Sequence, residues 1–232
     1  MYSILMKRQA LTNKPKVVQV EQSNRPSALS KPWEEVQLML KQDLSYVRTL
    51  AGSKEKDPFK ESLIEKYRST VETLLETHQG NYANLDVLWW FFMWHVDLGL
   101  LETIHDDFRN AIGTGLETPH NWKMNGQTAY CGYVFNYSLE AHKANKANKA
   151  NKEYERSYLL NAVQDLQSGE LATNAPLKVK MYRLVGDWHY EEGERELAYQ
   201  LYEQVMKLDP DKGGCKTKLK ELKEELGYGD TD

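Results

Sequence analysis

Cysteine and unbroken apolar stretches are both scarce in this chain. Only two cysteines occur among 232 residues, and neither Cys131 nor Cys215 belongs to a CxxC pair or lies near a histidine at metal-ligand spacing. A disulfide framework and a structural zinc site are therefore not expected, and two isolated thiols favour a reducing cytosol. The longest apolar run, 85–101, is interrupted by two aspartates, a histidine and a glycine, so no membrane span is expected. The first eight residues hold too short an apolar stretch for a secretory signal.

The sequence also lacks the short motifs of common catalytic sites. It contains no nucleophile elbow, no phosphate-cradling glycine loop and no HExxH. A metal-dependent nuclease needs clustered carboxylates to hold its metal ions, and the nearest candidates are Asp57, Glu61, Asp106 and Asp107. We interpret these four as helix-start, turn and helix-surface residues. No cofactor is expected, and Mg²⁺ would be required only by a nuclease.

Charge is distributed unevenly along the chain. Residues 1–31 carry six basic side chains and one acid, a charge of +5, whereas the whole chain carries −4. This segment has no helical periodicity and is predicted to be a flexible arm. Its cations could reach an acidic partner such as nucleic acid, and an ordinary soluble tail is the alternative. The arm residues proposed to contact DNA are Lys7, Arg8, Lys14 and Lys16.

A run of Lys-Ala-Asn repeats is the most unusual local feature. Lys143, Lys146, Lys149 and Lys152 follow one another at intervals of three residues, a stripe that drifts slowly around a helix. Lysine and asparagine both donate hydrogen bonds to phosphate oxygens, so this ridge could contact DNA. The alternative is a repeat expansion that lengthens an exposed helix or loop.

Apolar residues recur at helical spacing along most of the chain, and no convincing alternating strand is found. The sequence therefore predicts an all-α fold. The block Trp89–Trp94 is apolar nearly all round, which predicts a helix buried on several sides. A polar turn is expected over 51–58. Helices are expected over 33–50, 60–77, 85–94, 100–112, 128–158, 159–167, 177–191, 194–208 and 216–226.

Residues 179–212 carry the spacing of a tetratricopeptide-type helical hairpin. Gly186 and Ala198 would let two helices approach closely, Gly193 would lie in the turn, and Pro210 would end the second helix. A degenerate copy of the spacing occurs over 99–111. A hairpin of this kind cannot bury its own apolar face, so it must dock on another helical layer or on another subunit.

These patterns together predict a multi-helix body with two degenerate hairpins. The expected organisation is a flexible basic arm (1–31), a helical body (32–226) and a short acidic tail (227–232). Within the body we expect N-terminal helices (32–80), a first hairpin and loop (81–126), a lysine-repeat helix region (127–178), and the tetratricopeptide-like hairpin with a C-terminal helix (179–226).

Two stretches resemble a known family. Residues 85–119 run from Leu-Asp-Val-Leu-Trp-Trp-Phe-Phe-Met-Trp through Asp-Leu-Gly to Gly-Leu-Glu-Thr-Pro, and residues 186–226 include Glu-Glu-Gly-Glu and Leu-Asp-Pro-Asp-Lys-Gly-Gly-Cys-Lys. In this order and separation they are similar to the small terminase subunit of tailed temperate phages of the Peduovirus type, traditionally called the terminase endonuclease subunit. The resemblance covers roughly 60–226. It implies a homo-oligomer, ring-like or otherwise multimeric, in the cytoplasm of the bacterial host. This assembly would bind double-stranded viral DNA and recruit the large ATPase subunit for cutting and packaging.

The chain departs from that family at its C-terminal end. Family members often end in a long Lys/Arg-rich tail, whereas this chain ends Gly-Tyr-Gly-Asp-Thr-Asp. The arm or the lysine ridge would therefore supply the DNA contacts. The residues give no support to the nuclease label, so we assign cutting to the large subunit. Two alternatives stay open: an endonuclease in its own right, and a helical-repeat scaffold that binds proteins.

Overall fold

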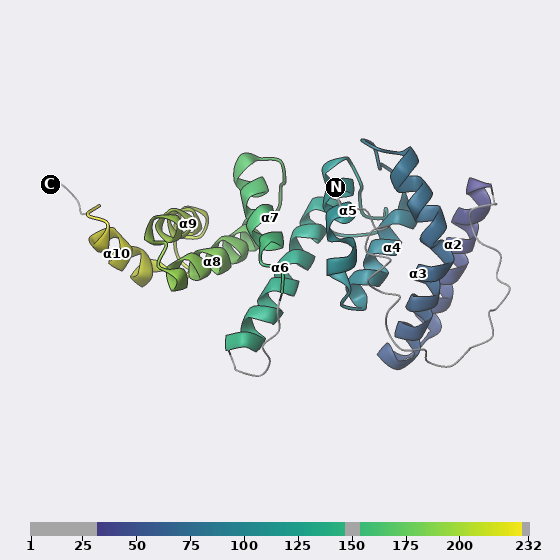
Figure 1. Ribbon diagram of the computed structural model, residues 1–232, viewed down its shortest axis with the longest axis horizontal. Coiled ribbons are helices and arrows are strands. Elements are labelled where there is room, and N and C mark those ends of the chain that lie inside the picture. Colours follow the sequence, from purple (N-terminus) through teal and green to yellow (C-terminus); the bar gives the residue numbers. More distant parts are fainter. Residues whose placement is uncertain (1–31, 147–153, 229–232) are drawn as a thin grey trace. The chain divides into compact units, whose positions relative to one another are not determined.

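The computed structural model describes residues 32–146 and 154–228, and all regular structure within these ranges is helical. This confirms the predicted all-α class. The predicted arm (1–31) and the last four residues lie outside the described residues. Figure 1 shows the helices α2 (Trp33–Thr49), α3 (Gly52–Thr77), α4 (Asp86–Asp97), α5 (Leu101–Gly113), α6 (Gly126–Lys146), α7 (Ser157–Ser168), α8 (Ala175–Glu192), α9 (Arg195–Leu208) and α10 (Lys216–Glu225).

The chain divides into two compact units. Unit 1 ends at Gly126 and contains α2 to α5, whereas unit 2 begins at Gln127 and contains α6 to α10. Each unit is described by itself below. No helix in the described part of the chain is both long and apolar enough to span a bilayer.

The core of unit 1 forms around α4. Every residue of α4 from Val87 to His95 is buried except Trp90, as expected for a helix that has no polar face. Aromatic rings join α4 to its neighbours: the ring of Trp94 lies 5.6 Å from that of Tyr67 in α3, and the ring of Phe92 lies 4.9 Å from that of Phe108 in α5. The predicted buried aromatic block is therefore confirmed.

Helix α2 is attached to this core by few side chains. Only Val36 and Leu40 of α2 are buried. Polar contacts supplement them, because the Asp43 carboxylate accepts hydrogen bonds from Lys66 Nζ (2.5 Å) and Tyr67 Oη (2.7 Å) of α3. Because few side chains of α2 are buried, one face of this helix lines an open groove.

The predicted turn over 51–58 is wrong, because α3 already begins at Gly52 and contains Pro58. Proline removes one backbone donor, whose helical acceptor would be the carbonyl of Lys54. Lys54 is exposed, so water can satisfy that carbonyl. The backbone N–H of Ala51 donates to Glu55 Oε2 (2.7 Å), which stabilises the helix start.

In unit 2, α8 and α9 form the predicted close hairpin. A Cβ atom at Gly186 would lie 2.9 Å from Tyr202 Cε1, so only glycine allows this approach without a shift. Gly193 ends α8 in the left-handed conformation (φ 83°), and α9 ends at Leu208 just before Asp209-Pro210. The hairpin packs on α7 through α8 and on α10 through α9.

The helix predicted over 128–158 does not extend that far. Helix α6 ends at Lys146, residues 147–153 lie outside the described residues, and 154–156 are not helical. Helix α7 starts at Ser157, whose backbone N–H donates to Glu155 Oε1 (3.1 Å). The non-helical residues 154–156 exclude one helix over the whole predicted range. Alanine and lysine of the run favour helix, whereas the repeated asparagine weakens that preference.

Candidate functional site

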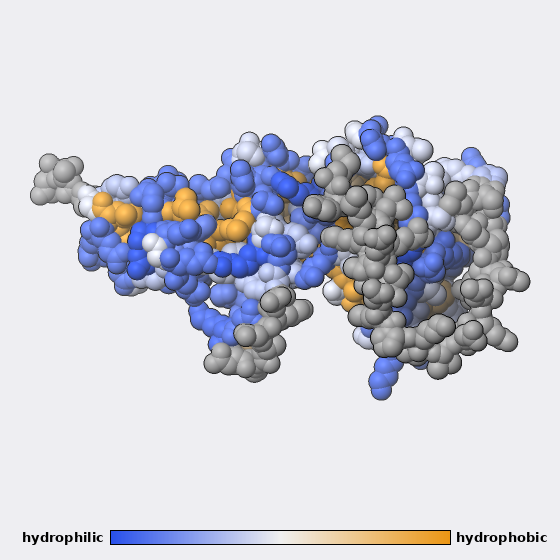
Figure 2. Space-filling view, in the orientation of Figure 1, coloured by the Kyte–Doolittle hydropathy of each residue, from blue (hydrophilic) through white to orange (hydrophobic). Residues whose placement is uncertain are grey.

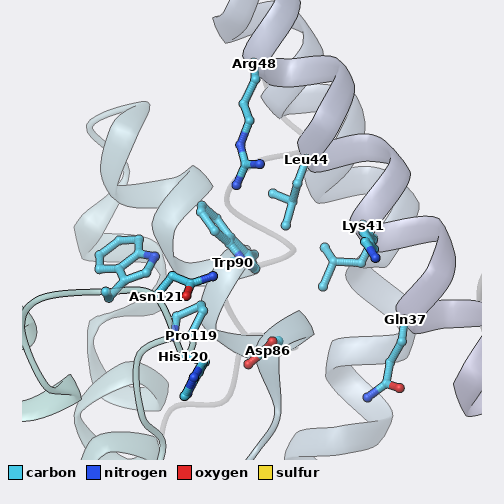
Figure 3. Close-up of a pocket in the computed structure, with 11 residues that line it drawn as sticks. Gln37, Lys41, Leu44, Arg48, Asp86, Trp90, Pro119, His120 and Asn121 are labelled. Atoms are coloured by element: carbon cyan, nitrogen blue, oxygen red, sulfur yellow. The ribbon is translucent and has the colours of Figure 1, made fainter.

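A groove of about 530 Å³ lies in unit 1 between α2, α4 and the loop that follows α5 (Figure 3). The side chains from α2 recur every three or four residues and therefore share one face of the helix. In Figure 3 this face lies opposite Asp86, Trp90 and the segment from Pro119 to Asn121. The lining residues are Gln37, Leu40, Lys41, Leu44, Arg48, Asp86, Trp90, Pro119, His120, Asn121 and Trp122.

Aromatic packing fixes the loop wall of this groove. The ring of Trp122 meets those of Trp89 and Trp90 edge to face, at centroid distances of 5.3 and 5.7 Å. The backbone N–H of Trp122 donates to the carbonyl of Pro119 (2.9 Å). Thr118 Oγ1 also donates to the carbonyl of Met124 (2.7 Å). The loop is thus pinned to the core and forms a defined wall.

Two cations lie beside the apolar floor of the groove, which consists of Leu40, Leu44 and Trp90. Lys41 and Arg48 are exposed and seven residues apart, which is about 10 Å along a helix. Within the described residues neither forms an ion pair, whereas Lys60 and Lys66 of α3 are both paired with aspartates. Partial burial raises the pKa of Asp86 at the opposite wall. Cations beside Leu40, Leu44 and Trp90 would suit an acidic segment that has apolar anchors.

The lysine run is described only at its beginning, in the last turn of α6. Lys143 Nζ lies 3.3 Å from Glu140 Oε1, and Lys146 Nζ lies 3.0 Å from Glu191 Oε1 in α8. The hydrogen bond with Glu191 raises the pKa of Lys146. The other proposed DNA contacts, Lys149, Lys152 and the arm residues Lys7, Arg8, Lys14 and Lys16, lie outside the described residues.

Further cationic and aromatic side chains gather near Trp188 in α8. The Arg156 guanidinium lies 4.5 Å from the centre of the Trp188 ring and also pairs with Glu192. Trp188 Nε1 donates to His142 Nδ1 (3.1 Å).

Both described lysines of the run, Lys143 and Lys146, are exposed and paired with glutamates. Exposed ion pairs contribute only about 0–1 kcal/mol each, so a phosphate group could replace either glutamate as the partner.

The four nuclease candidates do not form a metal-binding group. Asp57 lies 3.7 Å from Lys60 Nζ, and Glu61 is exposed in the next turn of α3. In α5, Asp106 accepts a hydrogen bond from His105 Nδ1 (3.0 Å). Burial raises the pKa of Tyr82, and the nearby Asp107 adds to this effect. Across residues 32–146 and 154–228, the one group of three possible metal ligands is His189, Glu192 and Glu194.

That group at the turn between α8 and α9 was not predicted from the sequence. Its ligand atoms lie within 4.8 Å of one another, and both glutamates are exposed. His189 Nδ1 already pairs with Glu194, and Glu192 pairs with Arg156. Because the Arg156 guanidinium would repel a metal ion, we interpret the group as an ion-pair network that ties the hairpin turn to Arg156.

The chain matches a known protein family over more than half of its length. Residues 37–173 match the family described as "Phage small terminase subunit". The matched segment includes the groove of Figure 3, the nuclease candidates and the whole lysine run. No curated protein and no solved structure matches the chain.

Proposed function

The chain belongs to the phage small terminase subunit family, and from this membership we propose that it binds viral DNA and the large terminase subunit to initiate genome packaging. The match covers more than half of the chain and carries the proposal. Family membership gives the protein a role in phage DNA packaging. The finer steps below, and the host cytoplasm as their place, are our proposal.

We place the DNA contacts on the lysine run and the arm, namely Lys143, Lys146, Lys149, Lys152, Lys7, Arg8, Lys14 and Lys16. The exposed pairs of Lys143 and Lys146 support this placement, because duplex phosphates can compete with single glutamates at a solvated surface. The arm adds its charge of +5. These contacts would position the protein on the duplex without reading its sequence.

The groove of Figure 3 is our proposed contact for the large subunit. Residues 32–126 hold fifteen acidic and nine basic residues, which disfavours nucleic acid along this unit. Within that acidic surface, Lys41 and Arg48 flank the apolar floor, and together they match an acidic amphipathic segment of the large subunit. Cutting is assigned to the large subunit, because the sequence of this chain carries none of the nuclease motifs sought above.

Self-association is assigned to unit 2. Figure 2 shows apolar side chains at the surface over α9 and α10. Leu197 and Leu208 of α9 are 45% and 39% exposed, and Tyr228 just after α10 is 43% exposed. Apolar side chains at these exposures would be covered by a second copy of the chain.

Retention of duplex DNA at rising salt tests the proposal. We expect log K to fall linearly with log salt, and removal of the four lysines as Gln variants to reduce the slope by about 0.9 per lost phosphate contact. Deletion of 1–31 should reduce it further. The control replaces three other lysines with Gln, namely Lys54, Lys56 and Lys123, which form no ion pair in the described residues.

The outcomes separate the alternatives. Unchanged retention in both the lysine variant and the deletion would remove the proposed contacts. Absence of DNA binding at low salt, together with capture of a protein partner, would favour the scaffold alternative. Charge reversal at Lys41 and Arg48 should abolish capture of the purified large subunit and leave DNA retention unchanged, and equal capture would exclude the groove.

A further inference from the structure

Four exposed cations surround the N-terminus of α10 in unit 2. Lys180 and Arg183 lie on α8, Lys212 lies in the loop before α10, and Lys216 is the first residue of α10. We call these four residues the α8–α10 basic surface. Within the described residues none of them forms an ion pair, whereas Lys207 and Lys218 nearby are each paired with a carboxylate.

Side-chain contacts link α8 to α10, both helices pack on α9, and this arrangement brings the four side chains to one surface. Asp187 Oδ1 lies 2.7 Å from Lys218 Nζ, and Tyr190 Oη lies 3.4 Å from Glu221 Oε2. In these two contacts the residue numbers increase together, from 187 to 190 in α8 and from 218 to 221 in α10. The two helices therefore run in the same direction where they meet. The N-terminus of α10 therefore lies beside the middle of α8.

Arg183 of α8 contacts the loop that precedes α10. Its Nη1 lies 3.5 Å from the carbonyl oxygen of Gly213, and a Cβ atom at Gly214 would lie only 2.5 Å from that nitrogen. The guanidinium thus rests on the Gly213-Gly214 backbone, one residue from Lys212 and two from Lys216. Lys180 precedes Arg183 by three residues, so both project from the same side of α8.

The local charge balance is positive. Three carboxylates are near: Asp187 is neutralised by Lys218, and the Asp209 carboxylate accepts the backbone N–H of Lys212 (2.9 Å). Asp209 keeps its charge and Asp211 is exposed, so two carboxylates offset the four cations and leave an excess of two positive charges. The first turn of α10 contains no acid, and no side chain caps it. Lysines at the positive end of a helix dipole are unfavourable, and an anion placed there would relieve the repulsion.

We propose that the α8–α10 basic surface binds the phosphate backbone of duplex DNA. This inference rests on the proposed function and adds a contact surface beyond the family match, which ends at residue 173. A polyanion fits better than a peptide, because the four residues are long, exposed cations with no ion-pair partner in the described residues. Two cations on α8 and two around the start of α10 can meet neighbouring phosphates, which are closely spaced along the duplex.

Salt-dependent DNA affinity of the full chain tests this surface. The variant carries K180Q, R183Q and K216Q, and the matched control carries K54Q, K56Q and K123Q, which removes the same charge from unit 1. The slope of log K against log salt should fall by about 2 to 3 in the variant, at 0.9 per lost phosphate contact, and affinity at 0.1 M salt should fall at least tenfold. The control should keep the slope of the unaltered chain.

Two results would overturn the inference. One is equal slopes for variant and control while the unaltered chain binds DNA. The other comes from lysine acetylation of the unaltered protein, which needs no folded variant. Bound duplex should protect Lys180, Lys212 and Lys216 but leave Lys54 and Lys123 reactive, and equal acetylation with and without DNA would contradict the contact. Failure of the unaltered chain to bind DNA at low salt is a different result, because it overturns the proposed function itself.

Discussion

At the scale of single residues, the close approach of α8 to α9 depends on Tyr202, which lies opposite Gly186. The ring of Tyr202 fills this space, and Tyr202 is fully buried. Its hydroxyl donates to Asp187 Oδ1 (2.7 Å) and accepts from Lys218 Nζ (3.3 Å). Burial and the neighbouring Asp187 raise the pKa of Tyr202, so the phenol stays protonated. A ring fixed at both its face and its hydroxyl cannot move away from an added methyl group.

Gly186→Ala should therefore destabilise unit 2. Its Cβ would lie 2.9 Å from Tyr202 Cε1, and overpacking of this kind costs about 1–3 kcal/mol, of which helix propensity returns less than about 1. Gly132→Ala in α6 is the control, because nothing lies within 4 Å of its added Cβ. That variant should gain up to about 1 kcal/mol. Urea unfolding measures both, and a Gly186→Ala variant as stable as Gly132→Ala would contradict the close approach.

His95 in α4 is a buried base held in its neutral form. Its Nδ1–H donates to the carbonyl of Phe91 (2.7 Å), and its side chain is only 5% exposed. Burial lowers the pKa of His95 from 6.5 to about 4. The unfolded chain consequently binds a proton at a pH where the folded chain does not.

Unit 1 should lose stability as the pH falls from about 6.5 towards 4. The contribution of His95 is fully present above pH 6.5, and the loss at pH 5.5 should be about 1 kcal/mol relative to pH 7.5. His95→Asn keeps a donor for Phe91 without the titration. Comparing urea midpoints of the two proteins at both pH values isolates the effect, and parallel pH dependences would refute it.

At the scale of elements, α2 depends on Asp43 for much of its attachment to α3. Asp43→Ala leaves Tyr67 Oη, on a fully buried residue, without its acceptor. The cost should be about 1–3 kcal/mol, with faster amide exchange in α2. Glu65→Ala, which breaks an exposed pair with Arg68, should cost less than about 1 kcal/mol. Equal losses in the two variants would show that Asp43 does not anchor the helix.

The helices themselves were largely predictable, because apolar periodicity and turn glycines are local signals. Gly193 is an example, since its left-handed conformation ends α8 where the sequence placed the turn. The sequence does not predict the start of α3, because Pro58 locally favours a turn, although its lost hydrogen bond falls at an exposed carbonyl. The local sequence does not indicate whether the carbonyl four residues before a proline is exposed to water, and this exposure decides whether a helix tolerates the proline.

The interfaces were much less predictable. The groove combines 37–48, 86–90 and 119–122, and the basic surface combines 180–183 with 212–216, so each depends on packing between distant segments. The lysine run was visible in the sequence. The pairing of Lys146 with Glu191, 45 residues away, was not. Charge in sequence indicates which side chains are available, and tertiary contacts decide which of them are already neutralised.

At the scale of the whole molecule, family membership and the distribution of charge lead to one account. The protein would hold DNA through cations of the arm, the lysine run and the α8–α10 basic surface. It would hold the large subunit through the groove of unit 1. In this proposal, cutting belongs to the complex and requires the large subunit.

A cleavage assay on concatemeric viral DNA with Mg²⁺ or Mn²⁺ tests this central claim most directly. It compares this protein alone, the large subunit alone, and both together. The account predicts no cutting by this protein alone, and cutting by the large subunit that increases when this protein is added. Cutting by this protein alone that is lost in Asp106→Ala or Asp107→Ala would contradict the account and establish the chain as a nuclease.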